Sequence, residues 1–379
     1  MTGTDHGGVG SRLSERERLC RLRLARTETV GPIGFRALIA RFGSAEAALA
    51  ALPELARRGG REAPLKIPSA RAAERMLAAA ESRGARLVVF GDADYPPPLA
   101  AIEDAPPVLF AKGHGSLLRR PAVAVVGARN ASAAGREQAR RMAAALGEAG
   151  YVVVSGLARG IDAAAHEAAL AHGTIGVAAG GLDVVYPREN AGLIARIAEE
   201  GLLLSEEPMG VRPTARHFPR RNRIVSGLAL GVVVVEAAER SGSLITARLA
   251  GEQGREVFAV PGSPLDARAA GTNRLIKQGA HLVEDAGDVI AVLRDLALPV
   301  FEPEREGPFT LGGPQEPRAA SERVRTAIRA LVGFTPVTID TLVRETGADP
   351  AEVAAAVLEL EIAGVLERLP GARVVRKAG

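Results

Sequence analysis

Between residues 86 and 298, short apolar runs rich in β-branched residues alternate with stretches of helical periodicity. Strands that are apolar along their whole length are typical of a parallel sheet with helices on both faces. We therefore predict an α/β fold for this region, an extended, Rossmann-like, doubly wound sheet. Ligands bind such sheets at the carboxyl ends of the strands, where this sequence places glycines, serines and arginines. The runs are RLVVF, VAVVG, YVVVSG, IGVAAG, LLLSE, GVVVVEA and EVFAVPG.

The segment before this region has a different pattern. Residues 1–85 have helical periodicity and predict an N-terminal helical domain of SAM-like or helix-hairpin-helix-like type. Within it, residues 29–44 (TVGPIGFRALIARFGS) place two glycines and a proline between helices, as in a hairpin whose N–H groups contact a DNA phosphate. A plain turn in a small helical bundle is the favoured alternative, because no basic cluster adjoins the hairpin.

The segment after the sheet region predicts a linker and a third domain. Residues 299–320 are rich in proline, glycine and acids, as linkers are. Residues 321–379 follow the order of a winged helix, with three helices and a short β pair. The third helix carries Glu352, Glu359 and Glu361 and no cation. Because DNA phosphates repel an acidic helix, we expect this winged-helix-like domain to contact protein.

The composition limits the class of protein without naming a partner. The 379 residues include one cysteine, Cys20, so no intrachain disulfide can form, and no leader-like or membrane-spanning run appears. We expect a cytoplasmic protein of two or three domains that does not contact a membrane. The net charge is only +4, yet 44 of the 48 basic residues are arginine. Arginine suits bidentate phosphate contacts, although a GC-rich genome would give the same bias.

The stretch VGARNAS (126–132) ends a strand in glycine and opens a helix, an arrangement that usually binds a phosphate. Gly127 would end the strand and Ala128 would keep the loop small. Arg129 would grip the phosphate together with the loop N–H groups, and Ser132 would cap the helix. The three-glycine dinucleotide fingerprint and the Gly-Lys-Ser/Thr ending of the P-loop are both absent. The sequence therefore lacks the motifs that would indicate NAD or ATP binding. We expect no cofactor and no metal.

Further candidate residues follow the next two apolar runs. SGLARGIDAAAH (155–166) places Arg159 in a turn, with Asp162 and His166 on the helix after it. A hydrolase would need a nucleophile elbow, which the sequence lacks, so we favour a capping aspartate and a structural histidine. In GGLDVVYPREN (180–190), Arg188 follows a Tyr-Pro break and is a weak signal alone.

The densest basic cluster lies in VRPTARHFPRRNRIVSGLA (211–229), where five arginines fall within twelve residues without an acid. Such a cluster repels itself unless carboxylates or a polyanion neutralise it. We favour a nucleic acid, with Phe218 as a stacking surface for a base, over a solvated helix paired to Glu206 and Glu207. The basic residues are Arg212, Arg216, Arg220, Arg221 and Arg223, with His217 beside them.

Two later stretches belong to the same rim of the predicted sheet. EAAERSGSLIT (236–246) lacks the Pro-Gly-Gly-x-Gly-Thr-x-x-Glu turn that a nucleotide-processing enzyme of this fold would carry. GTNRLIKQGAHLV (271–283) brings Lys277 to the rim, either as a ligand contact or as part of a buried turn.

Taken in order, these blocks resemble the successive motifs of the DNA-processing protein A family (DprA/Smf), over about residues 86–295. The resemblance implies a non-enzymatic protein that binds single-stranded DNA and protects incoming DNA during natural transformation. It also implies a homodimer, formed through the Rossmann-like domain, that helps to load RecA onto strands covered by single-strand-binding protein. The family's Gly-Ser-Arg loop falls on Gly127, Ala128 and Arg129, where alanine loses a hydroxyl contact to phosphate. Its basic residue after Tyr-Pro falls on Arg188, and its Phe-Pro-x-Arg-Asn-Arg block falls on residues 218–223.

The residues and the resemblance together give one expected function and two rivals. The expected partners are single-stranded DNA, RecA and a second copy of the chain, with single-strand-binding protein as a further candidate. The main alternative is a phosphoribohydrolase-like, nucleotide-processing enzyme, and a transcription regulator would need a basic recognition helix. The expected DNA-binding residues, none of them catalytic, are Gly127, Ala128, Arg129, Arg159, Arg188, His217, Phe218, Arg220, Arg221, Asn222, Arg223 and Lys277.

Overall fold

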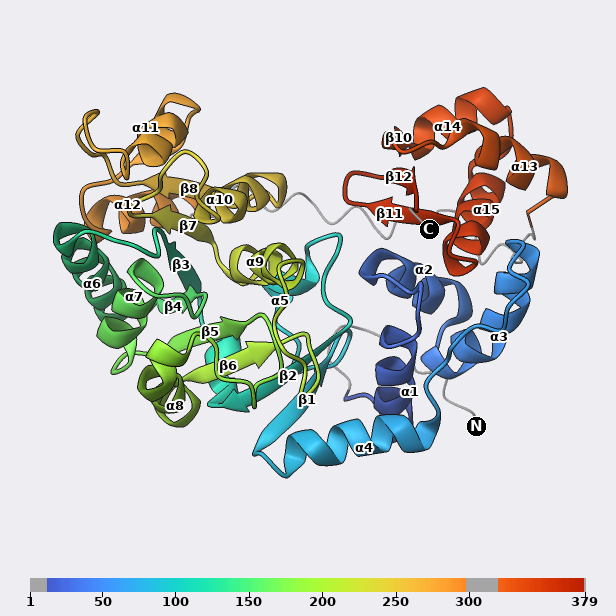
Figure 1. The fold of residues 1–379 in the computed structure, drawn as a ribbon, viewed down its shortest axis with the longest axis horizontal. Coiled ribbons are helices and arrows are strands. Elements are labelled where there is room, and N and C mark those ends of the chain that lie inside the picture. Colours follow the sequence, from blue (N-terminus) through green and yellow to red (C-terminus); the bar gives the residue numbers. More distant parts are fainter. Residues whose placement is uncertain (1–11, 298–319, 378–379) are drawn as a thin grey trace.

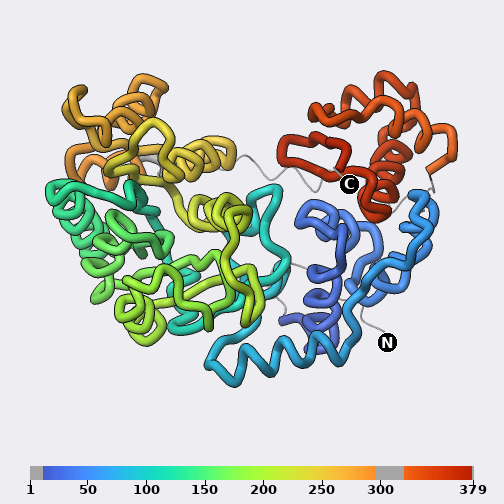
Figure 2. The backbone as a smooth tube through the Cα atoms, in the orientation of Figure 1, coloured from blue at the N-terminus to red at the C-terminus, as the bar shows by residue number. Residues whose placement is uncertain are grey.

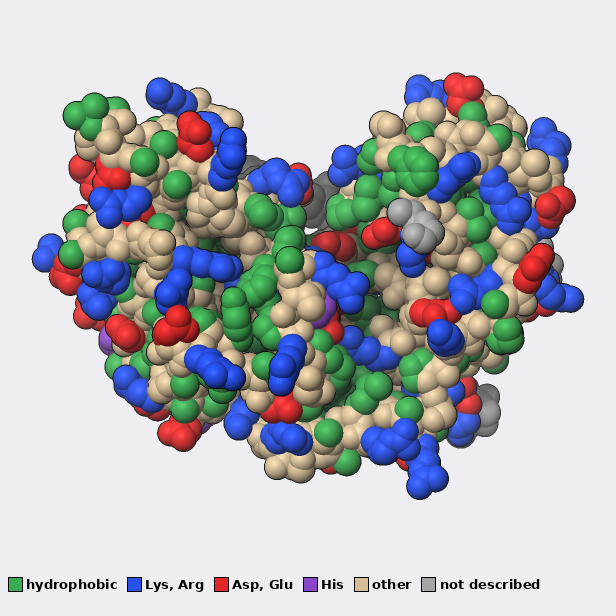
Figure 3. Space-filling view, in the orientation of Figure 1, with side chains coloured by type: hydrophobic (Ala, Val, Ile, Leu, Met, Phe, Trp, Pro, Cys, Tyr) green, Lys and Arg blue, Asp and Glu red, His purple; other side chains and the backbone are tan. Residues whose placement is uncertain are grey.

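The computed structural model describes residues 12–297 and 320–377, so the linker predicted at 299–320 falls outside the described residues except for its last one. A sheet domain lies on one side and two small domains, from the two ends of the chain, lie together on the other (Figure 1). The N-terminal helices, in blue, are next to the C-terminal domain, in red (Figure 2). A space-filling view shows a hollow between the sheet domain and this pair, with basic side chains on both sides (Figure 3). Among the described helices, none has the length and apolar character that crossing a membrane requires.

The N-terminal domain contains four helices with defined starts. The hydroxyls of Ser14, Ser44 and Ser69 each accept a hydrogen bond from a backbone N–H three residues on, which satisfies a donor that the helix start leaves free. Pro32, at the first position of the second helix, closes the predicted hairpin. The helices are α1 (Glu15–Ala25), α2 (Pro32–Phe42), α3 (Ala45–Arg58) and α4 (Ala70–Glu81).

The sheet domain confirms the predicted Rossmann-like architecture. Its nine strands lie in the order β1-β2-β6-β5-β4-β3-β7-β8-β9 and are parallel from β6 to β9. All seven predicted runs form strands, whereas β2 and the two-residue β9 were not predicted. Strand β2 joins β1 to β6 through antiparallel ladders. The strands are β1 (Ala85–Val89), β2 (Val108–Gly113), β3 (Ala122–Val126), β4 (Val152–Ser155), β5 (Thr174–Ala178), β6 (Leu202–Ser205), β7 (Gly231–Val234), β8 (Glu256–Ala259) and β9 (His281–Leu282).

Alternating side chains of the central strands pack against two layers of helices. On β3, Val123 and Val125 face the layer of α6, α7 and α12, whereas Ala124 and Val126 face the layer of α5, α9 and α10. Both faces of the sheet are therefore covered, which explains why its strands are apolar throughout. The helices of this domain are α5 (Pro97–Ala100), α6 (Ala133–Glu148), α7 (Ile161–Ala169), α8 (Ala191–Glu200), α9 (His217–Leu228), α10 (Ser243–Glu252), α11 (Ala270–Lys277) and α12 (Ala286–Ala297), with 3-10 turns η1 (Gly115–Arg119) and η2 (Arg188–Asn190).

The C-terminal domain has the predicted winged-helix order. Its core gathers around Ile328, Leu342 and Val353, one from each helix. The elements are α13 (Glu322–Leu331), β10 (Val337–Thr338), α14 (Ile339–Thr346), α15 (Pro350–Ile362), β11 (Leu366–Leu369) and β12 (Arg373–Arg376), with the strands in the order β10-β12-β11.

Helix α15, in the position of a winged-helix recognition helix, packs on the N-terminal domain. Leu358 and Ile362 belong to the same apolar cluster as α1, α2 and α3. The Thr29 hydroxyl donates to the carbonyl of Ile362 at 2.8 Å, and Arg329 donates to the carbonyl of Gly59. Helix α15 therefore contacts protein, as expected, and its partner is the N-terminal domain of the same chain.

The acids predicted to give α15 an acidic surface are mostly neutralised inside the domain. A carboxylate oxygen of Glu359 lies 2.8 Å from the guanidinium of Arg325, and one of Glu361 lies 2.9 Å from that of Arg368. Both glutamates are buried. The expectation of an exposed acidic helix is therefore wrong for these two residues, because burial and ion pairing remove their charge from the surface.

Gly59, at the end of α3, touches α15 so closely that no side chain fits. A Cβ atom there would lie 2.1 Å from the carbonyl oxygen of Glu359. That oxygen belongs to the backbone and cannot rotate away, so we expect Gly59→Ala to lower the free energy of unfolding by about 1–3 kcal/mol. Thermal unfolding measures this, with Gly251→Ala as control because nothing lies within 4 Å of its Cβ position. A Gly59→Ala midpoint equal to that of the wild type would contradict this interface.

Candidate nucleic-acid interface

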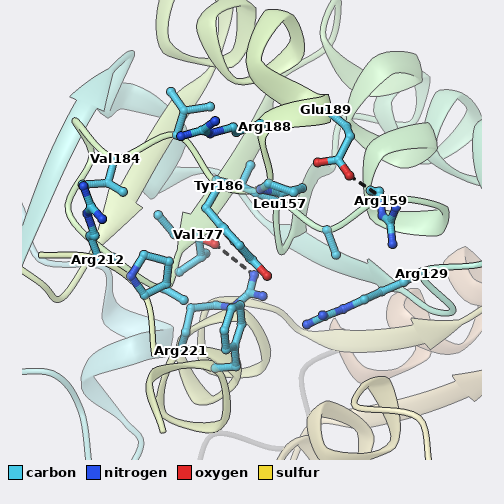
Figure 4. Close-up of a pocket in the computed structure, with 18 of the residues that line it drawn as sticks. Arg129, Leu157, Arg159, Val177, Val184, Tyr186, Arg188, Glu189, Arg212 and Arg221 are labelled. Carbon is cyan, nitrogen blue, oxygen red and sulfur yellow. Dashed lines mark hydrogen bonds and ion pairs between the residues drawn. The ribbon is translucent and has the colours of Figure 1, made fainter. Parts of the chain in front are cut away.

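Two adjoining grooves open at the carboxyl ends of the parallel strands. The arginine groove, of about 830 Å³, lies over the end of β5 (Figure 4). The hydroxyl groove, of about 720 Å³, lies over the ends of β3 and β4. The arginine groove is lined by Arg129, Arg159, Arg188, Arg212, Arg221, Tyr186 and Phe218, among others. The hydroxyl groove is lined by Gly127, Ala128, Asn222, Arg240, Ser241, Ser243 and Thr246, among others.

Arg129 and two aromatic rings form the ridge between the grooves. The Arg129 guanidinium lies over the ring of Phe218, 5.3 Å from its centroid, in a cation–π contact. The ring of Tyr186 lies 5.7 Å from that of Phe218, tilted by 56°. Among the described residues, no hydrogen bond or ion pair engages Arg129, and its side chain is exposed. The ridge therefore offers a free positive charge beside two ring faces.

Three further arginines surround the arginine groove. Arg188 and Arg212 are exposed, and neither has a hydrogen bond or an ion pair within residues 12–297 and 320–377. Arg159 lies 3.3 Å from Glu189 in an ion pair in which both side chains are about half exposed, at 52% and 59%. Such a pair is weak, so an anion can displace it at little cost. The groove thus has a positive rim that nothing inside the described chain neutralises fully.

Arg221 forms the buried wall of both grooves. Its Nη1 donates to the carbonyl of Val177 at 2.9 Å, and its guanidinium faces the carboxylate of Asp162. Gly156 makes room for the pair, because a Cβ atom there would lie 2.1 Å from Arg221 and 2.5 Å from Asp162. Burial raises the pKa of Asp162 to about 6, although the Arg221 charge opposes that shift. Arg221 is therefore held in place, and only part of its charge is free for a ligand.

His166 supports the loops below the grooves and is not exposed. Burial lowers the pKa of its ring to about 4, so the ring is neutral at pH 7. Nε2 donates to the carbonyl of Gly156 at 2.6 Å, and Nδ1 lies 2.7 Å from the hydroxyl oxygen of Thr174, which itself donates to the carbonyl of Val153. Both ring nitrogens are thus used inside the domain, as the structural interpretation of this histidine predicts.

The start of α6, where a phosphate was expected, already holds a carboxylate. Ser132 caps the helix as predicted, accepting a hydrogen bond from the N–H of Gly135 at 2.8 Å. Glu236 then accepts from the backbone N–H and the hydroxyl of Ser132, at 2.9 and 2.5 Å. The N–H of Gly127 faces Asp162 in the same way. The prediction that the loop N–H groups contact a phosphate is therefore wrong for Gly127 and Ser132, because protein carboxylates accept from these two groups.

The basic cluster of α9 divides into exposed and buried members. Arg223 is 4% exposed, and its Nη2 lies 2.8 Å from both carboxylate oxygens of Glu206. Its Nε lies 3.8 Å from Asp104. The prediction that Arg223 lines the groove is therefore wrong, because two acids hold it inside the protein. Arg220 is exposed and lies 3.5 Å from Glu206, too far for a strong ion pair.

The other predicted residues are distributed unevenly. His217 is 8% exposed, accepts a hydrogen bond from the N–H of Thr214 in the loop before α9, and lines neither groove. Asn222 lines the hydroxyl groove and donates to the carbonyl of Gly242 at 3.4 Å. Lys277 ends α11 and lines neither groove, so the structure does not bring it to the site.

In the arginine groove, Arg212 and Tyr186 contribute to the site although neither was among the predicted site residues. Arg212 was counted only as part of a dense basic cluster, and Tyr186 only as part of a Tyr-Pro break. An aromatic ring next to a loop proline and a second arginine-bearing loop are weak signals in sequence. The contact between Tyr186 and Phe218 joins segments 32 residues apart, and no local pattern encodes it.

The buried acid gives the arginine groove a pH dependence. Asp162 loses its charge as the pH falls through about 6, which leaves the positive charge of Arg221 uncompensated. We expect the affinity for a single-stranded oligonucleotide to rise about threefold between pH 7 and pH 5, the order of one charge acting across the groove. Fluorescence anisotropy at constant ionic strength measures it. Asp162→Asn should remove this part of the rise, and an unchanged pH profile in that variant would contradict the assignment.

Family models match each of the three domains. The family model described as DNA recombination-mediator protein A matches residues 86–294. A DprA-like N-terminal HHH domain matches residues 15–79, and a DprA winged helix domain matches residues 313–372.

Individual relatives agree with these matches. DNA processing protein DprA of Bacillus subtilis (strain 168) is 46% identical over 232 residues, which cover 60% of this chain and 78% of the relative. Protein Smf of Escherichia coli (strain K12) is 41% identical and covers 74% of each chain. The crystal structure of DprA from Streptococcus pneumoniae superposes with a TM-score of 0.60 at 37% identity, over 74% of this chain and 98% of that one. A DprA structure from Helicobacter pylori, described for its single-stranded DNA binding mode, gives 0.52 at 31% identity, over 56% and 96%.

Proposed function

This chain belongs to the DNA recombination-mediator protein A family, that of the DprA and Smf proteins, and from that premise we propose that it binds single-stranded DNA along its arginine groove. The observation that carries the proposal is the set of exposed arginines, Arg129, Arg188 and Arg212, that have no hydrogen-bond or ion-pair partner among the described residues. Phosphates supply the charge that these guanidinium groups lack. The Helicobacter pylori relative, a protein described as binding single-stranded DNA, supports the same ligand.

The preference for a single strand follows from the rings on the ridge. Tyr186 is 47% exposed, and it contacts Phe218, so a ring face is open to a stacked base. Bases are available for such stacking only when they are unpaired. Because stacking and phosphate contacts read no base edge, we expect little dependence on nucleotide sequence.

We further propose that binding occurs without catalysis. Asp162 and His166, the residues that invited a hydrolase interpretation, are buried and hydrogen-bonded within the domain. Glu236, the acid nearest the position of the glycine-rich turn of a nucleotide enzyme, is bonded to the start of α6. A phosphoribohydrolase-like activity would release free base from a nucleoside monophosphate, and chromatography of that reaction tests the alternative.

Within this function, the finer roles are proposals that rest on the family. We propose that the protein acts in the cytoplasm on incoming DNA during natural transformation, and that it helps to load RecA onto strands covered by single-strand-binding protein. A RecA filament assay on such covered strands tests the loading. Acceleration by the wild-type protein supports it, and no acceleration would leave DNA protection as the remaining role.

We also propose a homodimer formed through the sheet domain. Leu282, on the edge strand β9, is 52% exposed, so that edge carries apolar surface. We expect light scattering to give twice the chain mass of 39.3 kDa, and Leu282→Arg to shift the mass toward that of one chain. A variant that stays dimeric would place the interface elsewhere.

The direct test of DNA binding compares a labelled single strand with its duplex across a salt series. We expect the single strand to bind more tightly and its affinity to fall steeply as salt rises, because counterions released from phosphates drive the binding. Equal and weak binding of both forms would contradict the proposal.

A further inference from the structure

The hydroxyl groove continues the arginine groove along the edge of the sheet. The two share the wall built by Arg129, Phe218 and Arg221. The shared residues stand at the ends of neighbouring elements, so the grooves meet at the ridge rather than opening on different faces. A ligand that crosses the ridge from the arginine groove therefore enters the hydroxyl groove directly.

The lining of the hydroxyl groove is polar in a way that suits a sugar-phosphate backbone. Ser241, Ser243 and Thr246 carry hydroxyls at the start of α10, and Asn222 adds an amide across from them. The Ser241 and Ser243 hydroxyls bond to each other at 2.7 Å, so one hydroxyl proton of the pair remains available. Hydroxyls and amides are common donors to phosphate and sugar oxygens in nucleic-acid complexes.

One cation at this groove has no counter-charge. Arg240, in the loop between β7 and α10, is exposed, and no hydrogen bond or ion pair joins it to any residue that the structure describes. Arg268 also lines this groove, but its guanidinium lies 3.0 Å from the carboxylate of Asp266. The carboxylate of Asp162 faces Arg221 and does not reach toward Arg240 in any described contact. Arg240 thus resembles Arg129 and Arg188 in having an unsatisfied positive charge.

We propose that the hydroxyl groove is a second subsite for the same DNA strand, so that a single strand crosses the ridge at Phe218 and is held at its far end by Arg240. The proposal rests on the proposed single-strand binding and extends it to Arg240 and the neighbouring hydroxyls, which are not among the predicted DNA-binding residues. A phosphate meets Arg240, sugar and phosphate oxygens meet the hydroxyls, and a base at the ridge stacks on the exposed rings. Arg240 then contributes only when the strand is long enough to reach it.

The length of the strand therefore separates the two subsites in an experiment. Anisotropy titrations of wild type and Arg240→Ala use a short oligonucleotide of about 5 nucleotides and a long one of about 20, each across a salt series. We expect Arg240→Ala to bind the long strand about fivefold more weakly near 0.1 M salt, with a salt slope smaller by about 0.7, as the loss of one phosphate contact gives. The short strand should bind both proteins equally.

Arg248→Ala is the control for the loss of one positive charge. Arg248 is an exposed arginine of α10 that pairs with Glu252 at 2.7 Å and lines neither the arginine groove nor the hydroxyl groove. This variant should match the wild type on both lengths. If Arg240→Ala equals the wild type on the long strand, or weakens both lengths alike, the second subsite is wrong while single-strand binding stands. If the wild type itself does not prefer single strands, the proposed function fails and the second subsite falls with it.

Discussion

Replacing both Arg129 and Arg188 with alanine is expected to weaken single-strand binding by about 25-fold near 0.1 M salt, and to reduce the salt slope by about 1.4. Each of these arginines is exposed and free of hydrogen bonds and ion pairs within the described residues, so each can neutralise one phosphate. Because neither side chain supports the fold through such a bond, the unfolding midpoint of the variant should stay near that of the wild type. Anisotropy across a salt series and a thermal scan together measure both effects.

The control must separate local contacts from net charge. Arg71 and Arg75 lie on the exposed face of α4, away from the grooves, and neither has a hydrogen bond or ion pair in the described chain. Their double replacement by alanine changes the net charge by the same amount. If that variant loses as much affinity as the Arg129 and Arg188 variant, the binding depends on total charge and the arginine groove is not the site.

The fold could be predicted from the sequence because its signal is local. A strand buried on both faces must be apolar throughout, so six of the seven runs mark inner strands of the sheet, whereas RLVVF forms the edge strand β1. Strand β2 was not predicted, because Pro106 and Pro107 precede it and suggest a break. Its pairing with β1 and β6 also depends on residues distant in the sequence. The two-residue β9 is too short to have any periodicity.

The site could be predicted only in part, because residues far away in the sequence decide whether an arginine is paired with an acid or free. The sequence alone does not show that Arg129 and Arg188 stay unpaired whereas Arg223 is held by acids. The difference comes from Glu206 and Asp104, which reach Arg223 from other segments and leave the first two alone. The alternative interpretation of the α9 cluster, as a basic helix paired to acids, holds for Arg223, whereas the exposed members of the cluster stay available to a polyanion.

The helix-hairpin-helix unit shows the same limit. The glycines of its hairpin were weighed as a phosphate site against a plain turn, and neither interpretation considered the C-terminal domain. In the structure, a Cβ atom at Gly34 would lie 2.8 and 2.9 Å from the two carboxylate oxygens of Glu361. The missing side chain at Gly34 leaves room for Glu361 of α15, and a phosphate approaching that position would meet its carboxyl group. The residues that decide the use of the hairpin lie more than 300 positions away in the chain.

Arg223→Met is expected to lower the free energy of unfolding by about 3–5 kcal/mol, although it removes an arginine from the basic cluster of α9. Burial opposes the ionisation of Glu206, but the arginines around it, Arg223 first, hold its pKa below the usual value. Without Arg223 a buried carboxylate loses its two closest hydrogen bonds and most of its counter-charge. Chemical denaturation at pH 7 measures the loss, and the variant should bind single strands within about twofold of the wild type wherever it is folded.

Two further variants make the origin of this loss explicit. The Arg223→Met and Glu206→Gln double variant should recover part of the stability, because the uncompensated charge is gone. Arg220→Ala should show the opposite pattern, since its exposed side chain lies 3.5 Å from Glu206 and supports the fold little. Its stability should change by less than about 1 kcal/mol. If Arg223→Met were as stable as the wild type and weakened DNA binding instead, Arg223 would belong to the groove after all, and the buried pair with Glu206 would not describe the protein in solution.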